Sequence, residues 1–226
     1  AAVGAIPVYV ETTEGLVIDL DDLARKLPHA RHLLLSHMRG HICDMTRLMS
    51  LCDAAGVTVI EDCAHTMGAR WGGTNSGRFG RFGCYSTQTY KHLNSGEGGL
   101  LVSDDPEAMA RAVILSGSYM LYDRHVAAPG PEVFERVKYD TPNISGRMDN
   151  LRAAILRPQL ADLATQCARW NDRYRVVEAG LAGTPGLRLV ARPGDEHYVA
   201  SSFQFLLPGW SPVKVRRLPG PPRRSS

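Results

Sequence analysis

The sequence contains no apolar run of the roughly 18 residues that a membrane-spanning helix requires. Its first residues, AAVGAIPVYV, also lack the basic-then-apolar order of a secretory signal peptide. The five cysteines form no CxxC pair, and their odd number argues against a framework of disulfide bonds. We therefore expect a protein without membrane contacts that keeps its thiols reduced in the cytoplasm.

A strong charge of one sign is missing as well. The 26 basic and 23 acidic residues leave a formal net charge of +3, and they are spread along the chain. This balance gives no field of the kind that nucleic-acid binding requires. The exception is the basic, proline-rich end, VKVRRLPGPPRRSS, and we expect residues 208–226 to form a disordered tail.

The alternation of strand and helix patterns indicates the fold class. Two near-continuous apolar runs, residues 32–36 and 57–61, are typical of strands buried on both faces of a parallel sheet. Further strands are expected at residues 6–10, 83–87, 99–103 and 202–207. Helices are expected at residues 19–27, 43–55 and 106–117. The pattern predicts an α/β protein with a mainly parallel sheet and flanking helices.

The sequence pattern changes after Gly117. Residues 1–117 carry the alternation and form the predicted α/β core, whereas residues 118–147 show no clear period and are expected to form a long loop. From Met148 onward, the apolar spacing predicts a pair of long helices with a break or kink at Pro158. Residues 148–207 would hold these helices and the start of a C-terminal domain.

Lysine is scarce, and this makes its positions informative. Only four of the 26 basic residues are lysines: Lys26, Lys91, Lys138 and Lys214. Lys91 alone lies between a predicted strand and a glycine-rich segment, GEGG, where the backbone can approach a ligand closely. A lysine in a sequestered pocket can lose its proton and form a Schiff base.

Two further side chains lie beyond the carboxyl ends of predicted strands, where open α/β sheets bind ligands. Asp62 follows the run VTVIE, and Ser86 lies five residues before Lys91. Pyridoxal phosphate needs such a set: a lysine for its aldehyde, a carboxylate that keeps the pyridine nitrogen protonated, and donors for its phosphate. Taken singly each signal is weak, because an acid after a strand is more often a helix cap or a structural hydrogen-bond acceptor.

Two other kinds of site were considered on the residues alone. The segment GRFGRFG at 77–83 could bind an anion through Arg78 and Arg81, but it lacks the lysine and the spacing of a Walker motif, so a plain turn is favoured. Zinc ligands could come from five side chains that form no pair with the usual spacing: His37, His41, Cys63, His65 and Cys84. We therefore predict no metal site.

The stretch from Ala5 to Asp104 resembles the DegT/StrS family of pyridoxal-phosphate-dependent sugar aminotransferases, which belong to the aspartate aminotransferase-like fold type I. The resemblance rests on VIEDCAHTMGARWGG, GCYSTQTYKHLNSGEGGLLVSDD and RMDNLRAAILRPQL, and it continues through Leu160. It implies an incomplete large-domain sheet of that type, a homodimer, and transfer of an amino group from a donor to a keto sugar or keto cyclitol. Lys91 would form the internal aldimine, whereas the dehydratase branch has histidine in its place.

The resemblance also assigns roles to other residues. Asp62 would contact the pyridine nitrogen, Ser86 would bind the phosphate, and Ala64 would pack against the ring. His65 matches a position that is commonly glutamine or histidine and lies beside the ring and its phenolic oxygen. Once freed from the aldimine, Lys91 would move protons between the substrate α-carbon and the aldehyde carbon of the cofactor.

The chain departs from the family pattern in two ways. An asparagine that reaches the neighbouring subunit's phosphate often lies two residues before Arg147, but Ser145 stands there and Asn143 lies two further back, so either could serve. The family is also longer, so the resemblance implies a core with both ends cut and without the upstream turn that cradles the phosphate. The alternative is a catalytically silent family member that acts as a binding or oligomerisation partner.

Overall fold

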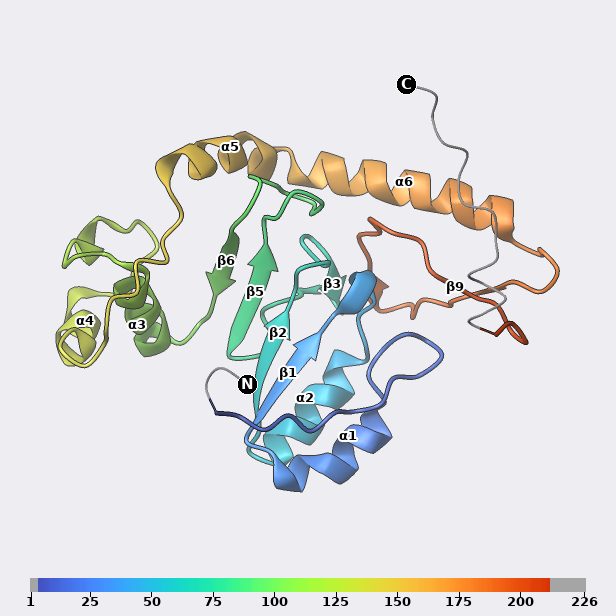
Figure 1. Cartoon of the computed structure of the whole chain (residues 1–226), viewed down its shortest axis with the longest axis horizontal. Coiled ribbons are helices and arrows are strands. Elements are labelled where there is room, and N and C mark those ends of the chain that lie inside the picture. Colours follow the sequence, from blue (N-terminus) through green and yellow to red (C-terminus); the bar gives the residue numbers. More distant parts are fainter. Residues whose placement is uncertain (1–3, 212–226) are drawn as a thin grey trace.

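The computed structural model describes residues 4–211 and has a four-stranded sheet in the order β1-β2-β5-β6 at its centre (Figure 1). The strands are β1 (His32–Ser36), β2 (Thr58–Asp62), β5 (Phe82–Ser86) and β6 (Gly99–Val102). Strands β1, β2 and β5 are parallel, and β6 pairs with β5 in the antiparallel sense. The prediction of an α/β protein with a mainly parallel sheet is confirmed.

Most helices begin at an aspartate that caps them. The helices are α1 (Leu20–Lys26), α2 (Met45–Ala54), α3 (Pro106–Ser116), α4 (Pro131–Val137), α5 (Asn150–Ala161) and α6 (Leu163–Leu181), with 3-10 turns η1 (Leu27–His29), η2 (Met38–Gly40) and η3 (Tyr122–Arg124). The caps of α1, α2, α3 and α5 are Asp19, Asp44, Asp105 and Asp149. Each of these side chains accepts a hydrogen bond from a first-turn amide, which has no partner inside its own helix.

The main core lies where α1 and α2 pack against β1 and β2 (Figure 1). Its fully buried side chains include Leu23 from α1 and Leu48 from α2. Strand β2 is buried or half-buried throughout, as expected for a strand with a neighbour on each side. The prediction that residues 32–36 are buried on both faces was wrong, because only Leu35 is fully buried in β1 and Leu34 is 70% exposed.

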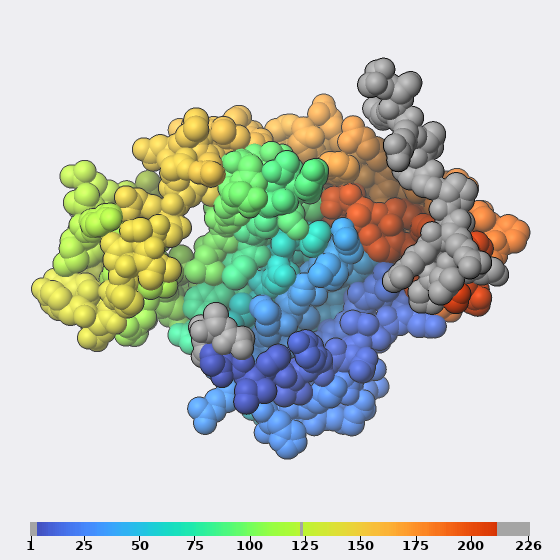
Figure 2. Space-filling view, in the orientation of Figure 1, coloured from blue at the N-terminus to red at the C-terminus, as the bar shows by residue number. Residues whose placement is uncertain are grey.

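Residues 118–147 differ from the expected long loop, because they include η3 and α4. Helix α4 starts at Pro131, a favourable first-turn residue, and buries Val133, Phe134 and Val137 against α3. The ring of Phe134 stacks on that of Tyr122 with centroids 4.1 Å apart. In the space-filling view this segment, coloured yellow-green to yellow, forms a lobe beside the sheet (Figure 2). The apolar residues are too few for a clear period, so the sequence pattern missed the helix.

The expected pair of long helices is present, but the break is not at Pro158. That proline lies inside α5, and the break falls at Asp162, between α5 and α6. The Asp162 amide still donates to the Pro158 carbonyl at 3.2 Å, so the first helix continues past the proline before the chain turns. A proline inside a helix removes one hydrogen bond and crowds the carbonyl four residues earlier, but this cost does not end α5.

The remaining strands are short. They are β3 (Arg70–Trp71), β4 (Thr74–Asn75) and β8 (Glu196–His197) in one sheet, and β7 (Arg188–Leu189) and β9 (Phe205–Leu206) in another. The strand predicted at 202–207 is thus reduced to β9, and residues 6–10 form no strand although they were predicted to. Within residues 4–211 no helix is both long and apolar enough to cross a membrane. The predicted tail lies outside the described residues from position 212 onward.

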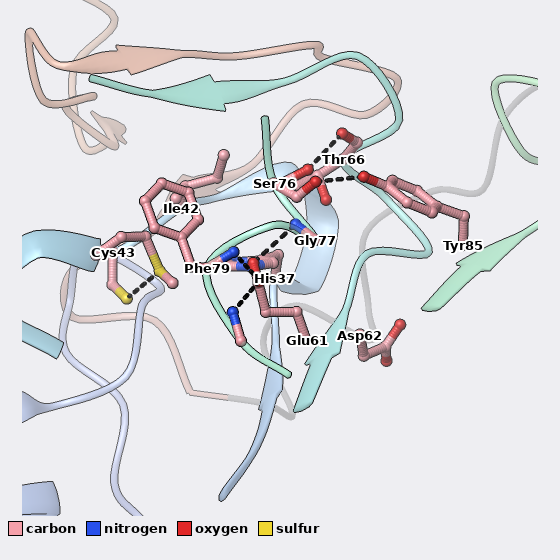
Figure 3. A network of polar contacts seen from close by, with 12 residues as sticks. His37, Ile42, Cys43, Glu61, Asp62, Thr66, Ser76, Gly77, Phe79 and Tyr85 are labelled. Carbon is pink, nitrogen blue, oxygen red and sulfur yellow. Dashed lines mark hydrogen bonds and ion pairs between the residues drawn. The ribbon is translucent and has the colours of Figure 1, made fainter. Parts of the chain in front are cut away.

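A buried carboxylate links the loops at one end of the sheet. Glu61 in β2 is fully buried, and one of its oxygens accepts hydrogen bonds from the amides of Phe79 and Gly80, both at 2.8 Å. The other oxygen contacts His37 Nε2 at 3.0 Å and accepts from the Gly77 amide at 2.8 Å (Figure 3). The glycine-rich segment 77–83 therefore binds an anion through its backbone, and that anion is the protein's own carboxylate.

Burial raises the pKa of Glu61, but the hydrogen bonds from His37, Gly80 and Gly77 outweigh it and leave the pKa below its usual value. The arginines of the segment take no part, because Arg78 pairs with Asp104 and Arg81 with Asp105 at its outer side. The expected turn at 77–83 is therefore present, and the structure gives it a reason: a ring of amides around a buried charge.

Replacing Glu61 tests how much this carboxylate stabilises the fold. We expect Glu61→Gln to lower the free energy of unfolding by about 3 kcal/mol, because an amide turns donors toward the buried donors of segment 77–80 and His37 loses its charged partner. Urea unfolding of both proteins measures this difference. The matched control Glu107→Gln removes an exposed partner of Arg111 and should cost less than about 1 kcal/mol. Equal losses in the two variants would contradict the assignment.

The Glu61→Gln variant also tests how the stability contributed by Glu61 depends on pH. A carboxyl group whose pKa is depressed by folding stabilises the protein fully above its unfolded pKa, about 4.3, and loses that effect as the pH falls through the folded value. The gap in unfolding free energy between wild type and Glu61→Gln should therefore be constant near neutral pH and shrink only below about pH 4.3. A gap that stays constant in acid would show that Glu61 is not ionised in the fold.

Candidate active site

The predicted site residues lie at or just beyond the C-terminal ends of β2 and β5. Throughout, the edge that carries the site means this end of the sheet. Asp62 ends β2 and lies in register with Ser36 on one side and Cys84 on the other. Because side chains alternate along a strand, Asp62 points away from the Glu61 cluster (Figure 3). One carboxylate oxygen accepts from the Ser36 hydroxyl at 3.1 Å and the other from the Ala64 amide at 3.1 Å.

Lys91 lies in the loop after β5 and reaches back toward β2. Its Nζ lies 3.1 Å from Nε2 of His65, which is half-buried in the turn after Asp62. Burial lowers the pKa of His65, the charges of Lys91 and then Arg39 lower it further, and Asp62 opposes them. The imidazole is therefore neutral near pH 7 and can accept a hydrogen bond from the lysine. Within residues 4–211, Lys91 forms no ion pair with a carboxylate.

The loop that carries Lys91 is closed by backbone hydrogen bonds. The Thr87 amide donates to Gly98, the Ser95 amide to Thr87, and the Thr89 amide to Gly96, each within 3.0 Å. Gly98 has a φ of 128°, and a Cβ there would lie 2.8 Å from the Thr87 hydroxyl oxygen. Glycine is therefore required at position 98 of the GEGG segment. The hydrogen bonds across the loop fix the backbone position of Lys91.

Ser86 and Ala64 lie at the same edge. The Ser86 hydroxyl oxygen accepts from the Gln88 amide at 3.2 Å, which leaves its own hydrogen to donate to another group. Ala64 is half-buried and presents only a methyl group beside Asp62 and His65. The structure therefore brings five sequence-predicted residues together at one sheet edge: Asp62, Ala64, His65, Ser86 and Lys91.

Asn143 is not part of this group. It is exposed, and its side-chain oxygen accepts from the Ser145 amide at 2.8 Å and lies 3.3 Å from the Ser145 hydroxyl. Ser145 is held in the left-handed region with a φ of 53°. No hydrogen bond in the described part of the chain joins either residue to Asp62 or Lys91. The choice between Asn143 and Ser145 stays open.

Two of the candidate metal-ligating residues, His37 and Cys63, lie close to Glu61 inside the protein. His37, Glu61 and Cys63 place one ligand atom each within 4.8 Å of one another. Both Glu61 oxygens already accept two contacts each, and burial raises the pKa of the Cys63 thiol to about 12. A neutral thiol and a carboxylate already satisfied by hydrogen bonds are poor metal ligands, so this cluster is structural.

Two residues near Lys91 were not singled out from the sequence. His92 follows Lys91, is buried, and has no hydrogen-bond partner for either ring nitrogen within the described residues. Burial lowers its pKa to about 4, with His65 adding to the effect, and the Val199 backbone opposes the shift without reaching hydrogen-bond geometry. Arg39 lies in η2, directly after β1. Their positions in the sequence could have indicated them, because His92 adjoins Lys91 and Arg39 follows the end of a predicted strand.

Comparison with known proteins identifies the family of the chain. The sequence pattern of the DegT/DnrJ/EryC1/StrS aminotransferase family matches residues 1–212. The chain is 34% identical over 205 residues to the dTDP-3-amino-3,4,6-trideoxy-alpha-D-glucose transaminase of Streptomyces venezuelae, which covers 86% of this chain and 49% of that protein. It is 33% identical to the L-glutamine:2-deoxy-scyllo-inosose aminotransferase of Streptomyces kanamyceticus, over 94% of this chain and 51% of that one.

Solved structures agree in fold. AtS13 from Actinomadura melliaura superposes with a TM-score of 0.77 at 29% identity, over 92% of this chain and 56% of that one. DesV from Streptomyces venezuelae, solved with a ketimine intermediate, also superposes with a TM-score of 0.77. It is 27% identical, over 98% of this chain and 64% of that one. The chain spans about half the length of the curated relatives it matches. The chain belongs to the DegT/DnrJ/EryC1/StrS aminotransferase family.

Proposed function

We propose that the protein is a pyridoxal-phosphate-dependent aminotransferase that transfers an amino group to a keto sugar or keto cyclitol. The observation that carries the proposal is the contact of Lys91 Nζ with Nε2 of His65, in the turn that follows Asp62 at the end of β2. A lysine needed only for structure would be expected to contact a carboxylate or solvent. This lysine is half-buried and faces an imidazole instead.

The donor set fits the cofactor. Pyridoxal phosphate supplies an aldehyde that condenses with amines and a ring that withdraws electrons from the carbon next to the bound nitrogen. Asp62 offers a carboxylate held by Ser36 and Ala64 and paired with no cation among residues 4–211, so it can accept a hydrogen bond from the ring nitrogen. Ser86 has a free hydroxyl hydrogen for the phosphate, and Lys91 has a primary amine for the aldehyde.

The chain's own residues divide the work of amino transfer. Lys91 Nζ would move a proton between the α-carbon of the substrate and the aldehyde carbon of the cofactor. His65 Nε2, which contacts Nζ at 3.1 Å, can accept a hydrogen bond from the amine and so hold it in place. Asp62 keeps a negative charge at the strand end, where it favours a protonated ring nitrogen. Ala64 leaves room for a flat ring beside these groups.

The names of the relatives support a class of substrate. The similar proteins include a transaminase of a dTDP-linked sugar and an aminotransferase of the cyclitol 2-deoxy-scyllo-inosose that uses L-glutamine. We therefore propose a keto sugar or keto cyclitol as acceptor and an amino acid as donor. We further propose a cytoplasmic homodimer in which Asn143 or Ser145 contributes to the neighbouring subunit's site. Both residues are exposed in this chain.

A lysine substitution tests the cofactor role. Wild-type protein mixed with pyridoxal phosphate should turn yellow, and borohydride reduction should fix the cofactor to one peptide that contains Lys91. Lys91→Ala should lose both the colour and the label, because no other amine lies at this edge among the described lysines. Peptide mass mapping after reduction gives the measurement.

The matched control is Lys138→Ala, which removes a lysine paired with Glu135 on α4 and should leave the label unchanged. Scattered labelling over several lysines, or no colour in the wild type, would contradict the proposal. That outcome would favour the alternative in which this chain is a catalytically silent binding or oligomerisation partner.

A second substitution separates cofactor binding from chemistry. Asp62→Asn keeps the shape of the side chain and removes the charge that favours a protonated ring nitrogen. We expect the variant to bind the cofactor through Lys91 while the amino-donor half-reaction slows on the order of 100-fold. Stopped-flow absorbance with an amino acid donor measures this rate. In the control Asp104→Asn, which alters an exposed partner of Arg78, the rate should not change. An undiminished rate in Asp62→Asn would exclude the role given to Asp62.

A further inference from the structure

The turn after β1 carries a strained arginine beside the candidate active site. Arg39 has a φ of 58°, in the left-handed region that residues with a Cβ rarely adopt. Gly40 follows with a φ of 80°, and a Cβ there would lie 3.1 Å from the His65 carbonyl oxygen and 3.3 Å from that of Val199. The turn therefore lies directly against the backbone of His65. Strain of this kind persists only where the surroundings hold it.

A buried set of polar groups from the C-terminal segment holds this turn. Arg192 donates to the Gly40 carbonyl at 3.0 Å and to Glu196 at 2.8 Å. The same Glu196 oxygen accepts from the Ile42 amide at 3.0 Å, and Gln204 contacts His41 at 3.0 Å. The turn is thus fixed by groups far along the chain. Such support fixes the backbone from which the Arg39 side chain extends in advance of any ligand.

The charge of Arg39 is not used within the described structure. Its side chain is exposed, and no carboxylate of residues 4–211 pairs with it. Its charge is close enough to lower the pKa of His65, in the same sense as burial and Lys91 and against Asp62. An exposed, unpaired guanidinium on a held turn therefore lies within electrostatic reach of the ring that contacts Lys91.

We propose that Arg39 binds the α-carboxylate of the amino donor, an inference that rests on the proposed aminotransferase function. In an amino acid the carboxylate and the reacting amine are attached to the same carbon, so the anion must lie close to Lys91. Arg39 is in the turn that touches His65, and His65 contacts Lys91 at 3.1 Å. A guanidinium can bind a carboxylate through two parallel hydrogen bonds, which also orients the α-carbon.

Phosphate groups on the acceptor fit this position less well. In a nucleotide-linked sugar the diphosphate is separated from a ring keto carbon by several bonds, so it lies farther from Lys91 than an α-carboxylate does. The proposal therefore assigns Arg39 to the donor half of the reaction, where it selects amino acids over simple amines.

The test compares two donors that differ only in the carboxylate. Cofactor-loaded wild type and Arg39→Gln are mixed with L-glutamine or with 4-aminobutanamide, its counterpart with hydrogen in place of the α-carboxylate. Stopped-flow absorbance gives the donor concentration at half-maximal rate. We expect Arg39→Gln to raise that concentration about 10- to 100-fold for L-glutamine and to leave it unchanged for 4-aminobutanamide. Arg39→Lys should restore part of the loss.

The matched control is Arg31→Gln. Arg31 is also exposed, but it precedes β1 and so lies at the opposite end of the same strand. Its substitution should leave the concentration at half-maximal rate unchanged for both donors. Equal effects of Arg39→Gln on both donors, or no effect on either, would overturn the proposal. So would a loss confined to the half-reaction with the keto substrate, since that result places a phosphate on Arg39.

A measurement on cofactor-free protein separates this proposal from the proposed function. The ring resonances of His65, followed by NMR, should shift when L-glutamine is added to wild type and should not shift in Arg39→Gln. If L-glutamine shifts the His65 resonances but the protein does not bind pyridoxal phosphate, the carboxylate site is supported and the proposed enzyme function is rejected. If the cofactor labels Lys91 but L-glutamine shifts the His65 resonances equally in wild type and Arg39→Gln, the enzyme function is supported and the role of Arg39 is rejected.

Discussion

The contact between the Glu61 carboxylate and its ring of donors is the constraint on which this end of the sheet depends. Its four contacts join the residue after β1 and the segment before β5 to the end of β2. Without the charge, amides of segment 77–80 would be buried without acceptors, a cost that hydrophobic packing does not offset. The strand ends are therefore fixed relative to one another before any ligand is present.

Strand alternation then turns this constraint into a site. Because Glu61 faces inward, its neighbour Asp62 must face the other side, and the same ring of contacts that fixes one carboxylate orients the other (Figure 3). Asp62 needs only Ser36 and Ala64 to complete its position. The adjacent acids thus do different work, one inside the fold and one at its edge, and the difference follows from the two-residue period of the strand.

Local patterns in the sequence predicted the sheet and much of the site because both follow from short segments. Asp62 could be placed from the apolar run before it, and Lys91 from the glycines after it. The apolar run 32–36 could not reveal that Leu34 faces outward, because its exposure depends on whether another layer covers that face of the sheet. Arg39 could not be found from pattern either, since its position depends on a hydrogen bond to Gly40 from a residue about 150 positions later.

The balance of charge at the site explains why burial matters there. Lys91 and Arg39 are both cations near His65, and a protonated imidazole between them would repel both. Burial keeps His65 and His92 neutral near pH 7, since it lowers the pKa of each, to about 4 for His92. The C-terminal end of the strands then combines two basic side chains, Lys91 and Arg39, with the carboxylate of Asp62. Its electrostatic character is therefore set by packing of the histidines as much as by the charged groups themselves.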